Sequence, residues 1–161
     1  MTNTAYHHGN LKNDLLDAGV EKANNSGFDA LSIRDLARET KVSPAAALRH
    51  FQDLAHLKAQ VSQRARELLA GYCIESLGGL GAHDMTLEDC LSRFEQLGLC
   101  YLRFARENPR LFNAAFAVCE AMPERHDNPS PWELLEESVD DLVAVGAVQS
   151  ERRNEAALAG W

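Results

Sequence analysis

The sequence has almost no strand signal, because its apolar residues recur at spacings of three and four instead of alternating. No apolar run approaches the roughly 20 residues that a bilayer-spanning helix needs, and the polar N-terminus lacks the apolar core of a signal peptide. The four cysteines have no CxxC spacing and lie within helical patterns. We therefore expect an all-α cytoplasmic protein, not a membrane protein, with reduced thiols; a thiol sensor pair is the alternative.

Motifs for catalysis and for metal binding are also missing. No serine lies in a GxSxG elbow, and no glycine-rich phosphate loop follows a strand. The adjacent His7 and His8 point to different helix faces, which disfavours a shared metal. His83 and His126 fall in polar loops and are expected to be solvated. We expect no enzyme activity, no cofactor and no metal.

Charge is distributed unevenly along the chain. The net charge is −8, but residues 1–60 carry seven basic and seven acidic side chains, so the acidic excess lies entirely after residue 60. This composition argues against a protein that coats nucleic acid indiscriminately. A neutral N-terminal module can still bind DNA if its cations share one face.

Apolar spacing predicts a first helix that follows an N-cap at Asn10 and ends at residues 24–27. Gly27 suits the left-handed position that follows a helix. Ser32 is the expected cap of a second helix, with Asp35 completing an imperfect capping box.

A third, short helix is predicted over residues 45–51, with Ser43 as its cap and Pro44 at its first position, where the missing N–H costs nothing. Two short helices joined by such a turn have the size of a helix-turn-helix, which places its second helix in the DNA major groove. Ala37 is small enough for the helix crossing. The expected inward residues are Ile33, Leu36, Val42, Leu48 and Phe51.

The outward face of this pair carries the candidate DNA contacts. Its alanines allow a close approach and can contact a thymine methyl, the two serine caps present N–H groups to phosphate, and polar or cationic side chains lie around them. A helical hairpin that only packs would show the same periodicity. The candidate DNA-binding residues are Ser32, Arg34, Lys41, Ser43, Ala45, Ala46, Arg49, His50 and Lys58.

The remaining chain predicts further helices over residues 54–77, 86–108, 109–116, 132–145 and 152–161. Aromatic and apolar residues at helical spacing in this part form either a core alone or the lining of a small-molecule pocket. The pocket candidates are Phe94, Leu97, Tyr101, Phe104, Phe112, Phe116 and Trp132.

Several runs together resemble the TetR family of transcriptional regulators: YHHGNLK at 6–12, ALSIRDLARE at 30–39, VSPAA at 42–46, RHF at 49–51, YLRFARENPRLF at 101–112 and AALAGW at 156–161. The resemblance implies an all-helical homodimer. A three-helix helix-turn-helix domain, residues 1–53 here, would read a near-palindromic operator as a repressor does. A helical domain, residues 54–161, would dimerise and bind a small-molecule effector that releases DNA. The resemblance also implies phosphate contacts for the two serine caps, base contacts for Ala45 and Ala46, and a backbone contact for His50.

The sequence departs from the family pattern at several positions. Lys41 stands where the family commonly has Gly, Leu48 where it favours Tyr and Leu54 where it favours Lys. Both replaced side chains usually touch phosphate, so we expect weaker DNA binding with a flatter salt dependence. The branch also continues beyond the equivalent of Trp161 into two long dimer helices, so we expect a truncated regulatory domain that dimerises only when those helices are present. A helical interaction protein with weak or lost DNA binding is the alternative function.

Overall fold

A computed structural model describes residues 11–78, 85–121, 123 and 129–161. The described residues form eight α-helices and two short 3-10 turns, and they contain no strand. The all-α prediction is confirmed. The predicted cap at Asn10, residues 6–10 of the YHHGNLK run and the histidines at 7, 8, 83 and 126 lie outside the described residues. Within them, no helix is both long enough and apolar enough to cross a bilayer.

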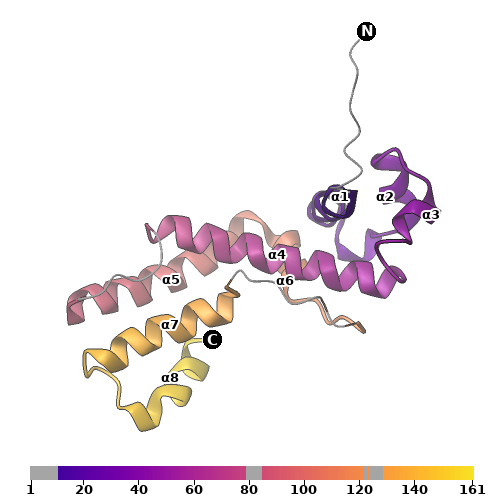
Figure 1. The fold of residues 1–161 in the computed structure, drawn as a ribbon. Helices are drawn as coiled ribbons and strands as arrows, with labels where there is room; N and C mark the ends of the chain where they lie inside the picture. Colours follow the sequence, from indigo (N-terminus) through magenta and orange to yellow (C-terminus); the bar gives the residue numbers. More distant parts are fainter. Residues whose placement is uncertain (1–10, 79–84, 122, 124–128) are drawn as a thin grey trace. The chain divides into compact units, whose positions relative to one another are not determined.

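The helices follow one another in an order close to the predicted one (Figure 1). Their bounds are α1 Leu11–Ser26, α2 Ile33–Glu39, α3 Pro44–Ala47, α4 Leu54–Ser76, α5 Leu87–Glu107, α6 Pro109–Ala115, α7 Pro131–Ala144 and α8 Arg153–Gly160, with 3-10 turns at Phe28–Ala30 and Ser150–Arg152. Helix α1 ends at Ser26, within the predicted range of 24–27. One prediction of length is wrong: α3 ends at Ala47 instead of extending to Phe51.

The chain divides into two compact units. The first comprises Met1–Ala65 with Arg110–Glu124, and the second Arg66–Pro109 with Arg125–Trp161. Helix α4 therefore contributes its first half to one unit and its second half to the other. The expected division of function, DNA binding in 1–53 and ligand binding with dimerisation in 54–161, stays a prediction.

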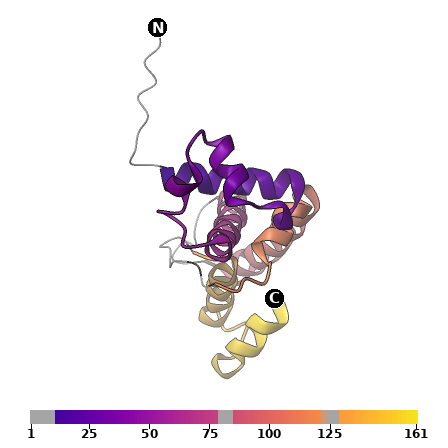
Figure 2. The ribbon, with the colours of Figure 1, turned by 90° about the vertical axis from the view of Figure 1, so that its right-hand side faces the viewer.

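In the first unit α1 crosses the beginning of α4, as the two ribbon views show (Figures 1 and 2). The crossing is close because Gly19 has no side chain: a Cβ atom there would lie 2.6 Å from Cγ2 of Val61, which is itself fully buried. The core of this unit consists of Leu15, Leu36, Phe51, Leu57 and Val61 with smaller neighbours.

Helix α6 belongs to the first unit although it is distant from α1 and α4 in sequence. The hydroxyl of the buried Ser62 on α4 donates to the carbonyl oxygen of Ala115 at 3.2 Å. The guanidinium of Arg110 donates to the carbonyl oxygen of Asn25, near the end of α1. These two bonds satisfy main-chain carbonyls near the ends of both helices and attach α6 to the unit.

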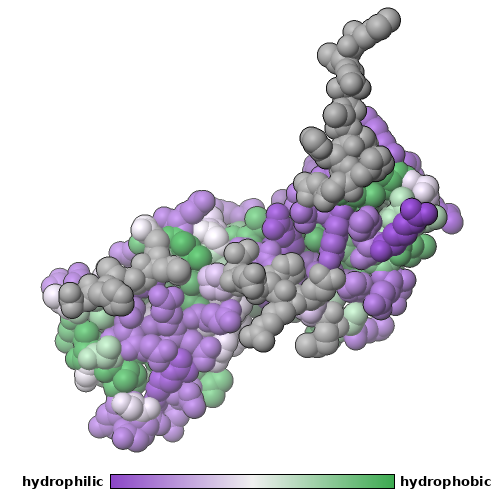
Figure 3. All heavy atoms as spheres, viewed as in Figure 1, coloured by the Kyte–Doolittle hydropathy of each residue, from purple (hydrophilic) through white to green (hydrophobic). Residues whose placement is uncertain are grey.

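The second unit packs α5 on α7 and α7 on α8. Two reciprocal capping boxes fix its helix starts, Thr86 with Asp89 at α5 and Ser130 with Glu133 at α7. One face of α5 stays open to solvent, with Leu87, Leu91 and Leu102 exposed. Figure 3 shows hydrophobic surface, in green, at the end of the unit where α5 begins.

Replacing Gly19 with Ala should destabilise the first unit. The new methyl collides with a stiff, buried Val61, and such overpacking costs about 1–3 kcal/mol, which exceeds the gain of about 1 kcal/mol from removing a mid-helix glycine. Gly71, in the middle of α4, has nothing within 4 Å of its Cβ position, so Gly71→Ala should stabilise. Urea unfolding of both variants measures the difference; a Gly19→Ala protein as stable as Gly71→Ala would contradict the tight crossing.

Candidate nucleic-acid interface

The turn between α2 and α3 is closed by main-chain hydrogen bonds. The N–H of Val42 donates to the carbonyl of Ala37 at 2.8 Å, and the N–H of Lys41 donates to Arg38 at 3.2 Å. This is the Schellman pattern, which needs a left-handed residue directly after the helix cap. That residue is Lys41, whose φ is 58°, and among the described non-glycine residues it alone has a positive φ. The turn therefore has glycine geometry without a glycine.

Only one of the two predicted serine caps forms a side-chain bond. Ser43 Oγ accepts the N–H of Ala46 at 3.1 Å, as predicted. Ser32 makes no capping bond, and Asp35 forms an ion pair with Arg38 at 2.8 Å instead of reaching back to the helix start. The predicted capping box at Ser32 is wrong, because the nearby guanidinium competes for the carboxylate.

The inward face differs from prediction at one position. Leu36, Ala37 and Phe51 are buried and Ile33 and Val42 are half-buried, in line with the prediction. Leu48, expected inside, is 48% exposed, and Ala47 is buried in its place.

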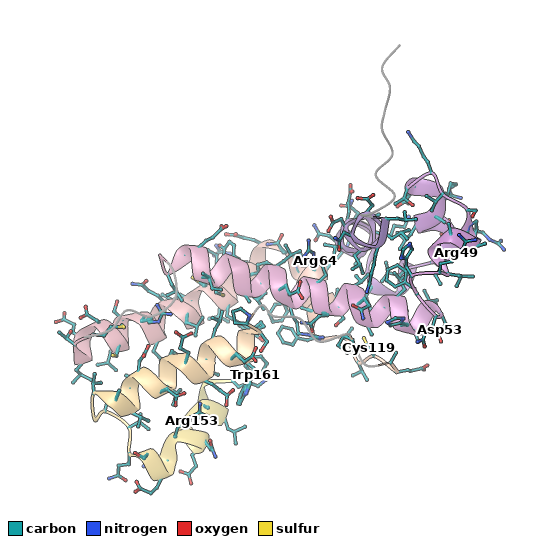
Figure 4. The ribbon with its side chains drawn as sticks, in the orientation of Figure 1. Arg49, Asp53, Arg64, Cys119, Arg153 and Trp161 are labelled. Atoms are coloured by element: carbon teal, nitrogen blue, oxygen red, sulfur yellow. The ribbon has the colours of Figure 1, made fainter. Side chains whose placement is uncertain are left out.

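The outward face gathers most of the candidate DNA contacts on α2, the turn and α3. Arg34, Lys41, Ser43, Ala45 and Arg49 are exposed, and Ser32, Ala46 and His50 are half-buried. Figure 4 shows the Arg49 side chain pointing away from the helices around it. The roles of these residues in binding stay predictions.

Lys58 lies apart from this set, on α4. Its ammonium group is 3.4 Å from a carboxylate oxygen of Asp29 and 5.2 Å from the ring centroid of Phe28. The ammonium group that we predicted to contact DNA therefore forms an ion pair and a cation–π contact within the protein.

The start of α4 is fixed by two residues that sequence reasoning missed. Asp53 Oδ1 accepts the N–H of His56 at 2.8 Å, and His56 Nδ1 accepts the N–H of Gln52 at 3.3 Å. Asp53 occupies the N-cap position where aspartate is preferred, so this signal was present in the sequence. Together they fix the chain between Phe51 and Leu54.

A cavity of about 270 Å³ lies within the second unit, and three of the seven pocket candidates, Phe94, Leu97 and Tyr101, line it. Burial, with a smaller effect from Cys100, raises the pKa of the Cys73 thiol to about 12, and burial also raises the pKa of the Tyr101 phenol. Both groups are therefore neutral at pH 7. The other lining residues are Cys73, Gly98, Leu102, Pro131, Leu135, Gly160 and Trp161, so the wall carries no charged side chain.

The remaining pocket candidates lie elsewhere. Phe104 is buried with its ring edge-to-face on Tyr72, and Trp132 packs edge-to-face on Trp161 at 5.4 Å between centroids. Phe112 and Phe116 contact each other in the first unit, with centroids 4.9 Å apart. The structure thus divides the aromatic pocket candidates between the two units.

Helix α8 forms one wall of the cavity and is clamped to α7 by Arg153. Its guanidinium donates to both carboxylate oxygens of Asp140, at 2.7 and 2.8 Å, and to Glu136 at 2.9 Å. The hydrogen bonds from Arg153 lower the pKa of the Asp140 carboxyl, and burial opposes them only in part.

Comparison with known proteins identifies relatives of this fold. Residues 15–61 match the model of the bacterial regulatory proteins of the tetR family. A protein of unknown function from Rhodococcus sp. RHA1 is 25% identical with a TM-score of 0.71, the match covering 98% of this chain and 80% of that one. Proposed TetR family regulators from Streptomyces coelicolor A3(2) and Shewanella sp. PV-4 are 19% and 18% identical, each with a TM-score of 0.54 and 92% coverage of this chain, and with 63% and 82% of their own lengths covered. No curated protein sequence matches the chain significantly.

Substitutions at Lys41 separate backbone strain from charge. Lys41→Gly relieves a left-handed conformation that costs a non-glycine residue about 1 kcal/mol, so it should raise the free energy of unfolding. Lys41→Ala removes the same charge but keeps the strain, and should leave stability near wild type. Urea unfolding of both variants measures the strain; equal stability would contradict it.

Loss of the Arg153 clamp should loosen α8 and change the environment of Trp161. Both tryptophans of the chain, Trp132 and Trp161, lie in this unit, so intrinsic emission reports on it. Arg153→Ala should shift the emission to the red, whereas Arg152→Ala, whose partner Glu155 lies on the same helix, should not.

Acid should have the same effect on the clamp. The lowered pKa of Asp140 means that its contribution is complete above the ordinary carboxyl value of about 3.9 and is lost as pH falls through the folded-state value. The wild-type emission should therefore stay constant from neutral pH down to about pH 5. A transition near pH 7 would contradict this assignment.

Proposed function

Because residues 15–61 of this chain match the model of the bacterial regulatory proteins of the tetR family, we propose that the protein is a DNA-binding transcriptional regulator that acts as a ligand-responsive repressor. The observation that carries the proposal is the α2–turn–α3 geometry. Its Schellman turn, its bonded Ser43 cap and its exposed Arg34, Lys41 and Arg49 present a polar, cationic edge around a short helix. This function would be carried out on chromosomal DNA, so we propose a cytoplasmic location.

Two copies of the chain would read a near-palindromic operator. A two-fold dimer places its recognition helices about 34 Å apart, one turn of the DNA helix. Within one copy, Ser43 and Ser32 are proposed at phosphates, Ala45 and Ala46 at base edges, and His50 at the DNA backbone.

The apolar cavity of the second unit supports a small-molecule effector. Its wall includes Phe94 and Tyr101 and has no charged side chain, which fits an uncharged, largely apolar ligand. Such a ligand would release DNA only through a difference in its affinity for the DNA-competent and DNA-incompetent states. Helix α4 belongs to both units and contributes Cys73 to the cavity.

A second candidate is a helical interaction protein that keeps this fold without binding DNA. The exposed Leu48 and Leu54, at 48% and 39%, favour it, because both stand where the family resemblance implies phosphate-binding side chains. An in vivo function that survives loss of the Arg49 and His50 side chains would support this candidate.

DNA binding is tested by fluorescence anisotropy with duplexes from the region upstream of the protein's own gene. Arg49→Ala should weaken binding about tenfold, a cost of about 1.4 kcal/mol, and should lower the slope of log affinity against log salt by about 0.9 if the lost contact is to phosphate. Arg152→Ala, which removes an exposed arginine from the second unit, should change neither. Absence of binding by a dimer at low salt would rule out the proposal.

A further inference from the structure

The short helix expected to enter the major groove has no side chain that can form a hydrogen bond. Helix α3 consists of Pro44 and three alanines, and Ala47 of these is buried. Between Phe28 and Phe51 the sequence also contains no Asn or Gln, the side chains that pair with adenine through two hydrogen bonds. Helix α3 itself therefore offers no side chain for hydrogen bonding to a base edge.

The exposed side chains of α3 and its C-cap are instead apolar. Ala45 is exposed, and Leu48, three residues later on the same helical face, is 48% exposed. Leu48 keeps right-handed helical backbone angles, with φ −66° and ψ −11°, so it extends the face that Ala45 begins. This pair, Ala45 and Leu48, forms a methyl-bearing surface at the centre of the candidate interface.

We propose that the protein reads its operator mainly through thymine methyl groups, which Ala45 and Leu48 contact in the major groove. The proposal rests on the DNA-binding function proposed above and names the bases that this function selects. The thymine C5-methyl is the apolar group that a base pair presents in the major groove, and contact with it buries part of a leucine that otherwise stays half in water.

The polar neighbours of this pair have narrower roles. The Ser43 hydroxyl already accepts the N–H of Ala46, which leaves its O–H and one lone pair for DNA. Arg49 is exposed beside Leu48 and can pair with a guanine. The proposed readout therefore favours thymine in the half-site, with Arg49 available to read a G·C pair.

The test starts from duplexes selected by the full chain from a random pool. Each thymine of the selected site is replaced by deoxyuridine, which removes the methyl and keeps every hydrogen-bonding group. Affinity should fall about fourfold for each contacted methyl, the equivalent of 0.8 kcal/mol for one buried methyl-sized group. In a second set of duplexes a contacted thymine is exchanged for cytosine, with guanine opposite. Replacing that cytosine by 5-methylcytosine returns the methyl group and should restore part of the affinity.

Variants assign the methyl contacts to this pair. Leu48→Ala should abolish the deoxyuridine penalty at one position in each half-site and leave the penalty at the other. Leu68→Ala, which truncates an exposed leucine of α4 in the second unit, should keep the wild-type pattern, and circular dichroism checks that both variants fold.

The outcomes distinguish this proposal from the DNA-binding function itself. Selective binding that deoxyuridine leaves unchanged, or a Leu48→Ala protein with the full wild-type penalties, overturns the thymine readout while DNA binding stands. Failure to bind any duplex overturns both. A Leu48→Ala protein that binds DNA normally but loses a protein partner would identify Leu48 as a protein contact and also overturns the readout.

Discussion

The candidate interface depends on one turn of backbone in which Lys41 is held at positive φ. Two main-chain hydrogen bonds, from Lys41 and Val42 to the carbonyls of α2, fix the direction in which the chain leaves that helix. The Ser43 cap then starts α3, so the position of Ala45, Leu48 and Arg49 follows from this turn. The strain of a side chain in the left-handed region is small beside the packing of Leu36, Ala37 and Phe51 around it.

Each unit relies on a different kind of contact. The first depends on close backbone approach, where Gly19 on α1 meets Val61 on α4, and on hydrogen bonds that bring in α6. The second depends on capped helices and on charged side chains between them, above all Arg153 on α8 with the carboxylates of α7. The uncharged cavity of the second unit therefore has one wall attached by ion pairs.

Sequence reasoning predicted what local chemistry controls. The helix order, the Ser43 cap and the TetR resemblance are confirmed. Gly27 has the predicted positive φ of 93°, but its ψ of 156° is extended and not left-handed helical. It did not predict which partner a charged side chain takes. Asp35 pairs with Arg38 instead of capping α2, and Lys58 is held by Asp29 and Phe28.

Two further errors concern which face of a helix is buried and which unit that face packs in. Ala47 is buried and Leu48 is exposed, the reverse of the prediction. Helix α3 has only four residues, and apolar periodicity over so short a segment fixes the buried face only to within one residue. The pocket candidates were predicted to line one site, but Phe112 and Phe116 follow the break at Pro109 and pack in the first unit. A helix pattern shows which residues share a face and does not show which body that face packs against.

The alanine content of α3 has a consequence for how such a protein diversifies. Its packing depends on the buried Ala47, on Phe51 and on the Ser43 cap, whereas Ala45 is exposed and Leu48 is about half exposed. Under the proposed thymine readout, substitutions at these two outward positions would change the DNA sequence that is selected and leave the buried residues in place. On that readout, a duplicated gene would acquire a new operator by one or two codon changes, while the hydrophobic core of its product stays as it was.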